Sequence, residues 1–120
     1  EGAAASLPTG SVEEHYTVEA WIKPTTGNQG PNGLVAWAGT GSTGDAFWFV
    51  YEATSTETKI IHRLGDYSIQ AVSPQRLDDG EWHHVAVTYD GSTRRVFIDY
   101  IEEMFDASIV AVSVTGTSNF

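Results

Sequence analysis

The chain has 120 residues, of which 41% are hydrophobic and 12% aromatic, a composition that favours one folded domain over a disordered segment. Lys and Arg number 6 against 16 Asp and Glu, so the formal net charge is −10 and binding to nucleic acid or anionic lipid is disfavoured. Cysteine is absent, which excludes disulfides and cysteine metal sites, and no apolar run approaches the roughly 20 residues of a membrane span.

In chain order, the sequence reads as short strands separated by Gly, Ser, Thr, Asn and Asp. Residues 16–23 alternate in period two, with Val18 and Ile22 on the face expected to be buried. Glycine-rich loops are predicted at residues 25–33 and 39–45. Further strands are predicted at residues 34–38, 46–52, 59–64, 68–72, 82–89, 94–100 and 108–114. The absence of helical periodicity predicts an all-β fold, an antiparallel sandwich or barrel.

The clearest pattern is a hairpin in the second half of the chain. Residues 82–89 are β-branched and aromatic, residues 90–93 read as a turn, and residues 94–100 return. Gly91 supplies a residue that accepts positive φ. The period-two alternation along the predicted strands places one set of side chains on the inward face, and this set is the predicted core. Its members are Val18, Ala20, Ile22, Val85, Val87, Val96 and Ile98.

Two blocks of sequence resemble a known family. Tyr-Thr-Val-Glu-Ala-Trp-Ile-Lys-Pro at residues 16–24 is similar to the early strand of laminin-G-like domains of the concanavalin A-like lectin/glucanase superfamily. Asp-Gly-Glu-Trp-His-His-Val-Ala-Val-Thr-Tyr-Asp-Gly at residues 79–91 resembles their hairpin. The resemblance implies one domain over residues 1–120 that folds as a jelly-roll sandwich of two antiparallel sheets. It also implies an extracellular or cell-surface location, adhesion, and glycans, proteins or calcium as ligands, among which fold alone does not choose.

The chain departs from the family pattern at two places. Asp99 is followed by Tyr100 where the family usually has Gly, so a different turn is expected there. The sequence also stops at residues 117–120, where the family begins another strand. We therefore expect an open sheet edge near residues 108–120. Such an edge would pair with a second copy or with the rest of a parent chain.

Retaining β-glucanases of the same superfamily carry Glu-x-Asp-x-x-Glu on one strand, with a nucleophile and a general acid on either side of the scissile bond. Asp99 and Glu102 match the last two positions, but Phe97 stands at the position of the nucleophile. A Phe side chain cannot form a glycosyl ester, so this route to hydrolysis is excluded. Asp99 and Glu102 are instead interpreted as solvated acids at a strand end, and the domain is expected to be non-catalytic.

The adjacent pair His83 and His84 suggests a metal or catalytic site at first sight. Neighbouring strand residues point to opposite faces, however, so both rings cannot easily reach one ion. A hydrogen-bonded structural role is the preferred interpretation for His83, which shares the face of Val85 and Val87. His84 lies on the other face, where a surface role is open.

Calcium is a candidate cofactor, because acids in loops at the sandwich rim hold calcium in the family. Asp90 is accounted for by the hairpin turn, and Asp78 is interpreted as part of a solvated turn before Trp82. Asp45 and Asp66 follow glycines in predicted loops and are less constrained by turn chemistry. They are therefore the predicted metal ligands.

Aromatic rings and amides are the candidate sugar-binding groups. Trp37 and Trp48 flank the loop 39–45 and are the better candidates for stacking platforms, although a core position is favoured for both. Asn28 and Asn32 in the loop 25–33 offer amides that both donate and accept hydrogen bonds. In contrast, the two other tryptophans, Trp21 and Trp82, occupy motif positions and are expected to pack inside.

These features favour a non-catalytic recognition module that binds a glycan or glycosylated surface, with calcium as a candidate aid. The alternative is a structural or assembly domain of a larger secreted protein or of a homo-oligomer. No nucleic-acid partner and no membrane span are expected.

Overall fold

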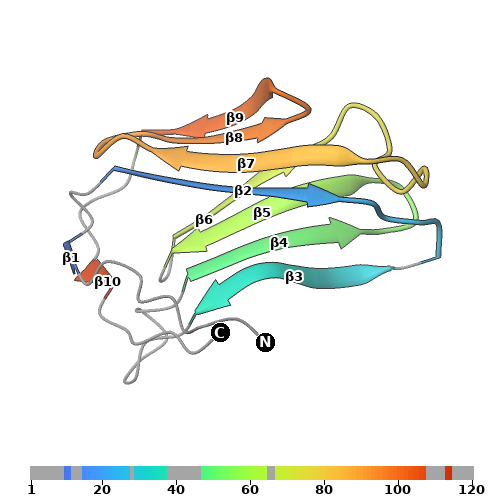
Figure 1. Cartoon of the computed structure of the whole chain (residues 1–120), viewed down its shortest axis with the longest axis horizontal. Coiled ribbons are helices and arrows are strands. Elements are labelled where there is room, and N and C mark those ends of the chain that lie inside the picture. The colour runs from blue at the N-terminus through green and yellow to red at the C-terminus, as the bar shows by residue number, and fades with distance from the viewer. Residues whose placement is uncertain are drawn as a thin grey trace.

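The protein is described here by a computed structural model, in which two antiparallel β-sheets face each other (Figure 1). The structure describes residues 10–11, 15–27, 29–37, 47–64, 67–107 and 113–114, with the backbone alone at residues 10, 11, 36, 37, 47, 113 and 114. Strands are the regular secondary structure of these residues. The predicted all-β sandwich is therefore confirmed.

Each large sheet has four strands. The first sheet has the order β2-β7-β8-β9, made of β2 (Tyr16–Ile22), β7 (His83–Tyr89), β8 (Arg94–Ile98) and β9 (Ile101–Asp106). The second has the order β3-β4-β5-β6, made of β3 (Gly30–Trp37), β4 (Phe47–Ala53), β5 (Thr58–Leu64) and β6 (Tyr67–Val72). A short third pair joins β1 (Gly10–Ser11) to β10 (Ser113–Val114).

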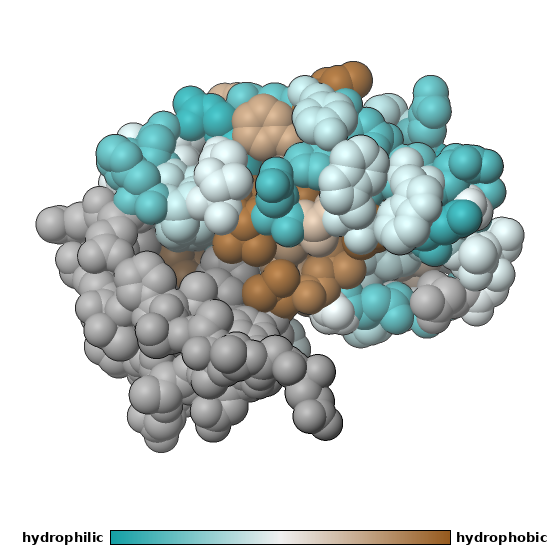
Figure 2. Space-filling view, viewed as in Figure 1, coloured by the Kyte–Doolittle hydropathy of each residue, from teal (hydrophilic) through white to brown (hydrophobic). Residues whose placement is uncertain are grey.

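The core lies between the two large sheets, where the period-two alternation of the strands places it. Val85, Val87 and Val96 are completely buried, and Ile22 and Ile98 are buried beside them. Two other members of the predicted core, Val18 and Ala20 on β2, are partly buried and pack against this cluster. Because β2 ends its sheet, these two have a neighbouring strand on one side only among the described residues. Figure 2 shows apolar surface along the side of the sandwich where β2 and β3 lie.

Strand β9 is the largest departure from the sequence prediction. The returning strand of the hairpin was expected to run to Tyr100, but β8 ends at Ile98 and a second hairpin leads into β9. This strand is hard to recognise in the sequence, because the side chains of Ile101–Asp106 do not alternate cleanly between apolar and polar. The pairing of β8 with β9 also shifts register between Val96 and Phe97, which breaks the expected pattern further.

The predicted loop 25–33 is wrong in its second half, because β3 already begins at Gly30. Pro31 is tolerated there since β3 is the end strand of its sheet, where a missing N–H need not interrupt a ladder. Gly30 enters the strand with φ of 104°, a value that favours glycine. Gly30 and Pro31 are therefore residues at the start of a strand and not part of a longer loop.

The predicted open edge near residues 108–120 lies mostly outside the described residues. The part that is described, Ser113–Val114, pairs antiparallel with Gly10–Ser11. In the two large sheets, the end strands are β2, β9, β3 and β6.

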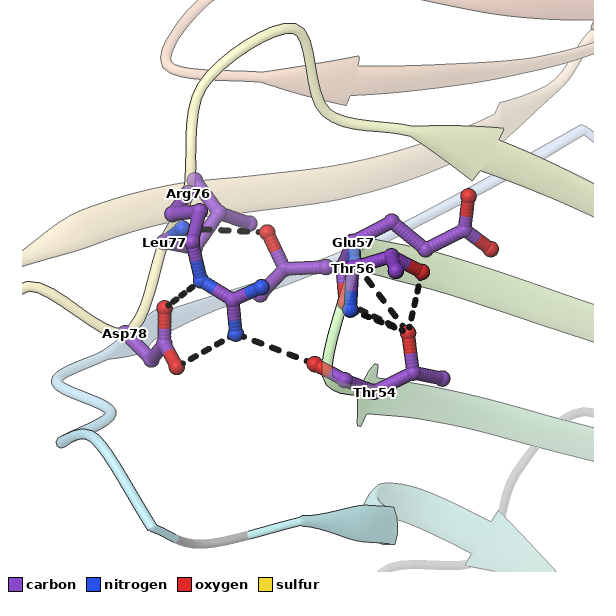
Figure 3. Close-up of polar contacts among 7 residues, drawn as sticks. Thr54, Thr56, Glu57, Arg76, Leu77 and Asp78 are labelled. Carbon is purple, nitrogen blue, oxygen red and sulfur yellow. Dashed lines mark hydrogen bonds and ion pairs between the residues drawn. The ribbon is translucent and has the colours of Figure 1, made fainter.

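The connection between β6 and β7 is fastened to the β4–β5 turn by Arg76 (Figure 3). Its guanidinium donates two hydrogen bonds of 2.7 Å to the Asp78 carboxylate and one of 3.1 Å to the Thr54 carbonyl. The Arg76 hydrogen bonds are also the main cause that lowers the pKa of Asp78. Asp78 is buried, so its expected place in a solvated turn is wrong: it completes this clamp.

Candidate functional site

The outer face of the β2-β7-β8-β9 sheet carries an exposed aromatic cluster. Trp21 on β2 lies directly opposite His84 on β7, and both point away from the core. Their ring centroids are 5.2 Å apart, with the planes inclined at 62°. This edge-to-face contact is the favourable geometry for neighbouring rings. It fixes the orientation of a tryptophan that has no partner strand on its other side in the described part of the chain.

Tyr100 joins the cluster from the two-residue turn between β8 and β9. Asp99 and Tyr100 both have positive φ, 49° and 68°, in a turn where glycine is the usual choice. The Tyr100 ring stacks on His84 at 4.6 Å with an interplanar angle of 9°. It also meets Trp21 edge-on at 6.3 Å. The unusual backbone of the turn thus delivers a third ring to the same surface.

A chain of charged hydrogen bonds holds this turn in place. The Asp99 backbone N–H donates to the His84 carbonyl at 2.8 Å, and the Asp99 carboxylate accepts from the His84 backbone N–H at 3.0 Å. His83 Nδ1 donates to Asp99 at 2.8 Å, and His83 Nε2 donates to Asp79 at 3.0 Å. Since both ring nitrogens face carboxylates, the geometry favours the protonated imidazolium. The predicted hydrogen-bonded role of His83 is confirmed.

These contacts set the pKa of His83. Burial of the ring lowers the pKa, but the carboxylates of Asp99 and then Asp79 outweigh it, so the net shift is upward. In return, the hydrogen bond from His83 and the backbone N–H of Glu81 hold the pKa of Asp79 below its ordinary range. His83, Asp79 and Asp99 therefore form one coupled electrostatic unit beneath the turn.

Three exposed rings define what we call the aromatic surface: Trp21, Trp82 and Tyr100, with the buried His84 between Trp21 and Tyr100. Their exposed fractions are 57%, 60% and 70%. Figure 2 shows aromatic rings of intermediate hydropathy gathered over this sheet. Lys23 Nζ lies 5.9 Å from the centroid of the Trp82 ring, a cation–π contact.

Glu19 adds an acidic group to the cluster. It lies two residues before Trp21 on the same face of β2, and its carboxylate accepts a hydrogen bond of 3.0 Å from His84 Nε2. The Glu19 side chain is 66% exposed, whereas the His84 side chain is 9% exposed. His84 Nδ1 is buried and has no hydrogen-bond partner among the residues that the structure describes. The surface therefore combines open rings with an accessible carboxylate.

The exposure of Trp21 and Trp82 corrects the prediction that both would pack inside. Period-two alternation puts Trp21 on the outer face, opposite the core side chain of Ile22. Within the described residues, no further element covers that face. Trp21 and Trp82 belong to the sequence blocks that resemble the family, and both are surface residues.

The predicted sugar-binding residues lie on or near the second sheet. Trp48 is on the outer face of β4, is 45% exposed and lies opposite Arg63 of β5. The backbone of Trp37 belongs to β3, while its side chain and all of Asn28 lie outside the described residues. The Asn32 side-chain nitrogen donates to the Gly30 carbonyl at 2.9 Å, so the NH2 group of that amide is already engaged by the backbone. Of the two predicted stacking platforms, Trp48 is the one whose side chain the structure describes, and it is exposed.

Both predicted calcium ligands, Asp45 and Asp66, also lie outside the described residues. Among the residues that the structure describes, no group of three or more His, Asp or Glu side chains could hold a metal ion. Asp90 serves the hairpin turn as expected, because its carboxylate accepts from the backbone N–H groups of Ser92 and Thr93. Those hydrogen bonds lower the pKa of Asp90 strongly.

The residues compared with the glucanase motif do not share one strand. Phe97 lies on β8, Asp99 lies in the turn, and Glu102 lies on β9 opposite Phe97. The Asp99 carboxylate is half exposed, as expected of a solvated acid, and it also accepts hydrogen bonds from His83 and from the His84 backbone N–H. Glu102 pairs with Arg95 at 3.4 Å. These two acids stabilise the fold rather than facing one another across a substrate.

Sequence reasoning missed the aromatic surface, although one signal pointed to it. Tyr100 stands where the family favours glycine. A bulky residue at positive φ is strained, and such strain suggests that the side chain has a functional role. The proximity of Trp21 to this turn could not be read from the sequence. It depends on the pairing of β2 with β7, in which Trp21 lies opposite His84, a residue more than 60 positions further along the chain.

Two facing antiparallel sheets define the chain as a β-sandwich module. Over residues 1–118 it matches the laminin-G-type model described as the Concanavalin A-like lectin/glucanases superfamily, and the chain belongs to that superfamily. This membership supports a lectin-like or adhesion-type module. Domains of this kind are generally non-catalytic and typically occur in extracellular proteins. No curated protein matches the chain. The described residues contain no helix with the length and hydrophobicity to cross a membrane.

Proposed function

We propose that this domain is a non-catalytic module that binds a glycan, free or on a glycosylated surface, through the aromatic surface. The observation that carries the proposal is the pair of open rings, Trp21 and Tyr100, fixed by contact with each other and with His84. The C–H faces of a sugar stack on such rings, and rings that are already fixed lose little conformational freedom on binding. The same proposal locates the domain outside the cell or on its surface, where glycans are displayed.

A glycan array, followed by titration of the best ligand, tests this function. Trp21→Ala and Tyr100→Ala should each weaken binding by at least about tenfold, which corresponds to about 1.4 kcal/mol. Trp48→Ala is the matched control, since it removes an exposed tryptophan from the other sheet. Loss of binding in Trp48→Ala alone would move the site to the second sheet, as first predicted. Failure of every glycan to bind would overturn the proposal.

Calcium assistance belongs to the same proposal, with Asp45 and Asp66 as the ligands. Calcium takes 6–8 oxygen ligands, so loop carboxylates would act together with backbone carbonyls. Calorimetric titration of the protein with calcium should detect binding that Asp45→Asn or Asp66→Asn weakens. Absence of binding at millimolar calcium would leave a calcium-independent module.

A second function, assembly, is favoured by the exposed edge strand β9. Ile101 and Phe105 are each 62% exposed, Met104 is 38% exposed, and β9 is the last strand of its sheet in the described part of the chain. An unpaired edge with apolar side chains is a template for a further strand, here one from a second copy or from the rest of a parent chain. Light scattering over a concentration series should detect dimers that Phe105→Glu dissociates. A strict monomer at all concentrations would exclude self-association.

A further inference from the structure

We propose that the aromatic surface takes glycans that carry free amino groups, such as chains of unacetylated hexosamine, and rejects sulfated or carboxylated glycans. This inference rests on the proposed glycan-binding function and adds the charge class of the ligand. It follows from the positions of the basic residues and from the accessible carboxylate beside the rings.

Every Lys and Arg of the chain can be placed, because the sequence holds only 6 and the structure describes all of them. Four lie away from the aromatic surface: Lys59 bound to Glu52, Arg76 bound to Asp78, Arg94 bound to Asp106, and Arg63 on the outer face of the second sheet. Only Lys23 and Arg95 remain for the outer face of the β2-β7-β8-β9 sheet.

Both of these cations already have partners. Lys23 lies over the Trp82 ring, and Arg95 binds Asp90 at 2.9 Å and Glu102 at 3.4 Å. The charge of His83 is balanced by two carboxylates. A sulfate or carboxylate group on a sugar would therefore have to displace an existing partner, and it would approach a protein of net charge −10. Anionic glycans are disfavoured at this surface.

Glu19 supplies the opposite preference. Its Oε2 accepts from His84 Nε2, and the described residues make no other hydrogen bond to this carboxylate. Residues two apart on a strand lie roughly 7 Å from each other on one face, close to the width of a sugar ring with its substituents. A sugar stacked on Trp21 can thus present an ammonium group to the Glu19 carboxylate. Such a charge-assisted hydrogen bond is stronger than one between neutral groups.

The buried His84 keeps this arrangement rigid. It contacts Trp21 edge-on, stacks on Tyr100 and donates to Glu19, so one side chain orients both rings and the acid. The spacing between the stacking surface and the carboxylate is therefore set before a ligand arrives.

The test compares two oligosaccharides with the same β-1,4-linked skeleton, glucosamine oligomers and N-acetylglucosamine oligomers of equal length, at mildly acidic pH. Calorimetry should give at least about tenfold tighter binding for the amine form, a difference that added salt reduces. Heparin fragments of similar length should bind more weakly than either. Glu19→Gln should abolish the preference for the amine form, so that the two oligomers bind with similar affinity.

Glu57→Gln is the matched control, because it removes one negative charge from the β4–β5 turn, which belongs to the other sheet. It should leave the preference intact. If both oligomers bind equally and Trp21→Ala weakens both, the charge preference is overturned while glycan binding stands. Tighter binding of heparin also overturns the preference. If no oligosaccharide binds, glycan binding itself fails.

Discussion

The two hairpins that share β8 reverse the chain by different means. In the β7–β8 turn, Gly91 takes φ of 90°, and the Asp90 carboxylate accepts hydrogen bonds from the next backbone N–H groups. In the β8–β9 turn, Asp99 and Tyr100 take positive φ without a glycine. The first turn is encoded by its own residues, whereas the second depends on His83 and His84 from another strand. Only the first kind can be read from a local sequence.

The second hairpin is also where the function is proposed to lie. A non-glycine residue at positive φ costs roughly 1–2 kcal/mol, so the turn is strained relative to its neighbour. Hydrogen bonds to Asp99 and the stacking of Tyr100 on His84 offset that strain. Three expected outcomes test the contrast between a turn held by its own residues and a turn held by tertiary contacts.

The largest effect is expected at Arg94, which ties the open end of the second hairpin. Arg94 is completely buried, pairs with Asp106 at 3.0 Å and reaches His62 and the Tyr67 carbonyl. Arg94→Leu removes the charged partner of Asp106 and the hydrogen bonds to His62 and the Tyr67 carbonyl, and it should cost about 3–5 kcal/mol of unfolding free energy. Arg95→Leu, on the exposed face of the same strand, should cost less than about 1 kcal/mol. Equal losses in urea denaturation would contradict this assignment.

An intermediate effect is expected when the two turns are altered in parallel. Asp99→Ala removes two hydrogen bonds and the residue type that tolerates positive φ, so it should cost about 2–3 kcal/mol. Gly91→Ala places a Cβ at φ of 90° and should cost about 1–2 kcal/mol.

The two turn variants should also differ in ligand binding. Asp99→Ala should displace Tyr100 and weaken glycan binding, while Gly91→Ala should leave it unchanged. Thermal unfolding combined with the glycan titration measures both properties. A Gly91→Ala variant that loses binding would mean that the two hairpins are not independent.

The smallest effect is a pH dependence from His83. Because its pKa is raised above the ordinary value of 6.5 in the folded state, its stabilising contribution is complete below that value. This contribution is lost as pH rises through the raised folded pKa. The lowered pKa of Asp79 adds stability above its ordinary 3.8 that is lost as pH falls. The unit is therefore most stabilising between these two ordinary values.

His83→Gln should remove the loss of stability on the alkaline side, an effect of about 1 kcal/mol because its carboxylate partners are half exposed. Wild type and variant should be compared over a pH series. His62 also affects the pH dependence, because burial and Arg94 lower its pKa to about 3, so that it destabilises the fold on the acidic side. This contribution is common to wild type and variant, and it cancels when the two stability curves are subtracted. Parallel curves for the two proteins above neutral pH would exclude His83 as the cause.

Much of the fold could be predicted because it follows from alternation and from local turns. The core residues Val85, Val87 and Val96 and the first hairpin were correct for that reason. Strand β9 was missed because its pattern is broken by a register shift and its turn lacks a glycine. The aromatic surface was missed because strand pairing, which a single sequence does not reveal, brings Trp21 and Tyr100 together. Trp48 is exposed as a sugar-binding role requires, and that role stays a prediction.

The exposure of Trp21, Trp48 and Trp82 has a spectroscopic consequence. Intrinsic fluorescence should arise largely from indoles that already meet water, so the native emission should be accessible to dissolved quenchers. The carboxylate of Glu19 lies beside one of these indoles, and the chain as a whole is acidic. Relative to their action on free tryptophan at low salt, quenching by caesium ions should therefore be enhanced over quenching by iodide ions, while charge should not affect quenching by neutral acrylamide. A ligand that covers Trp21 would protect this emission, and the domain would report its own occupancy without a label.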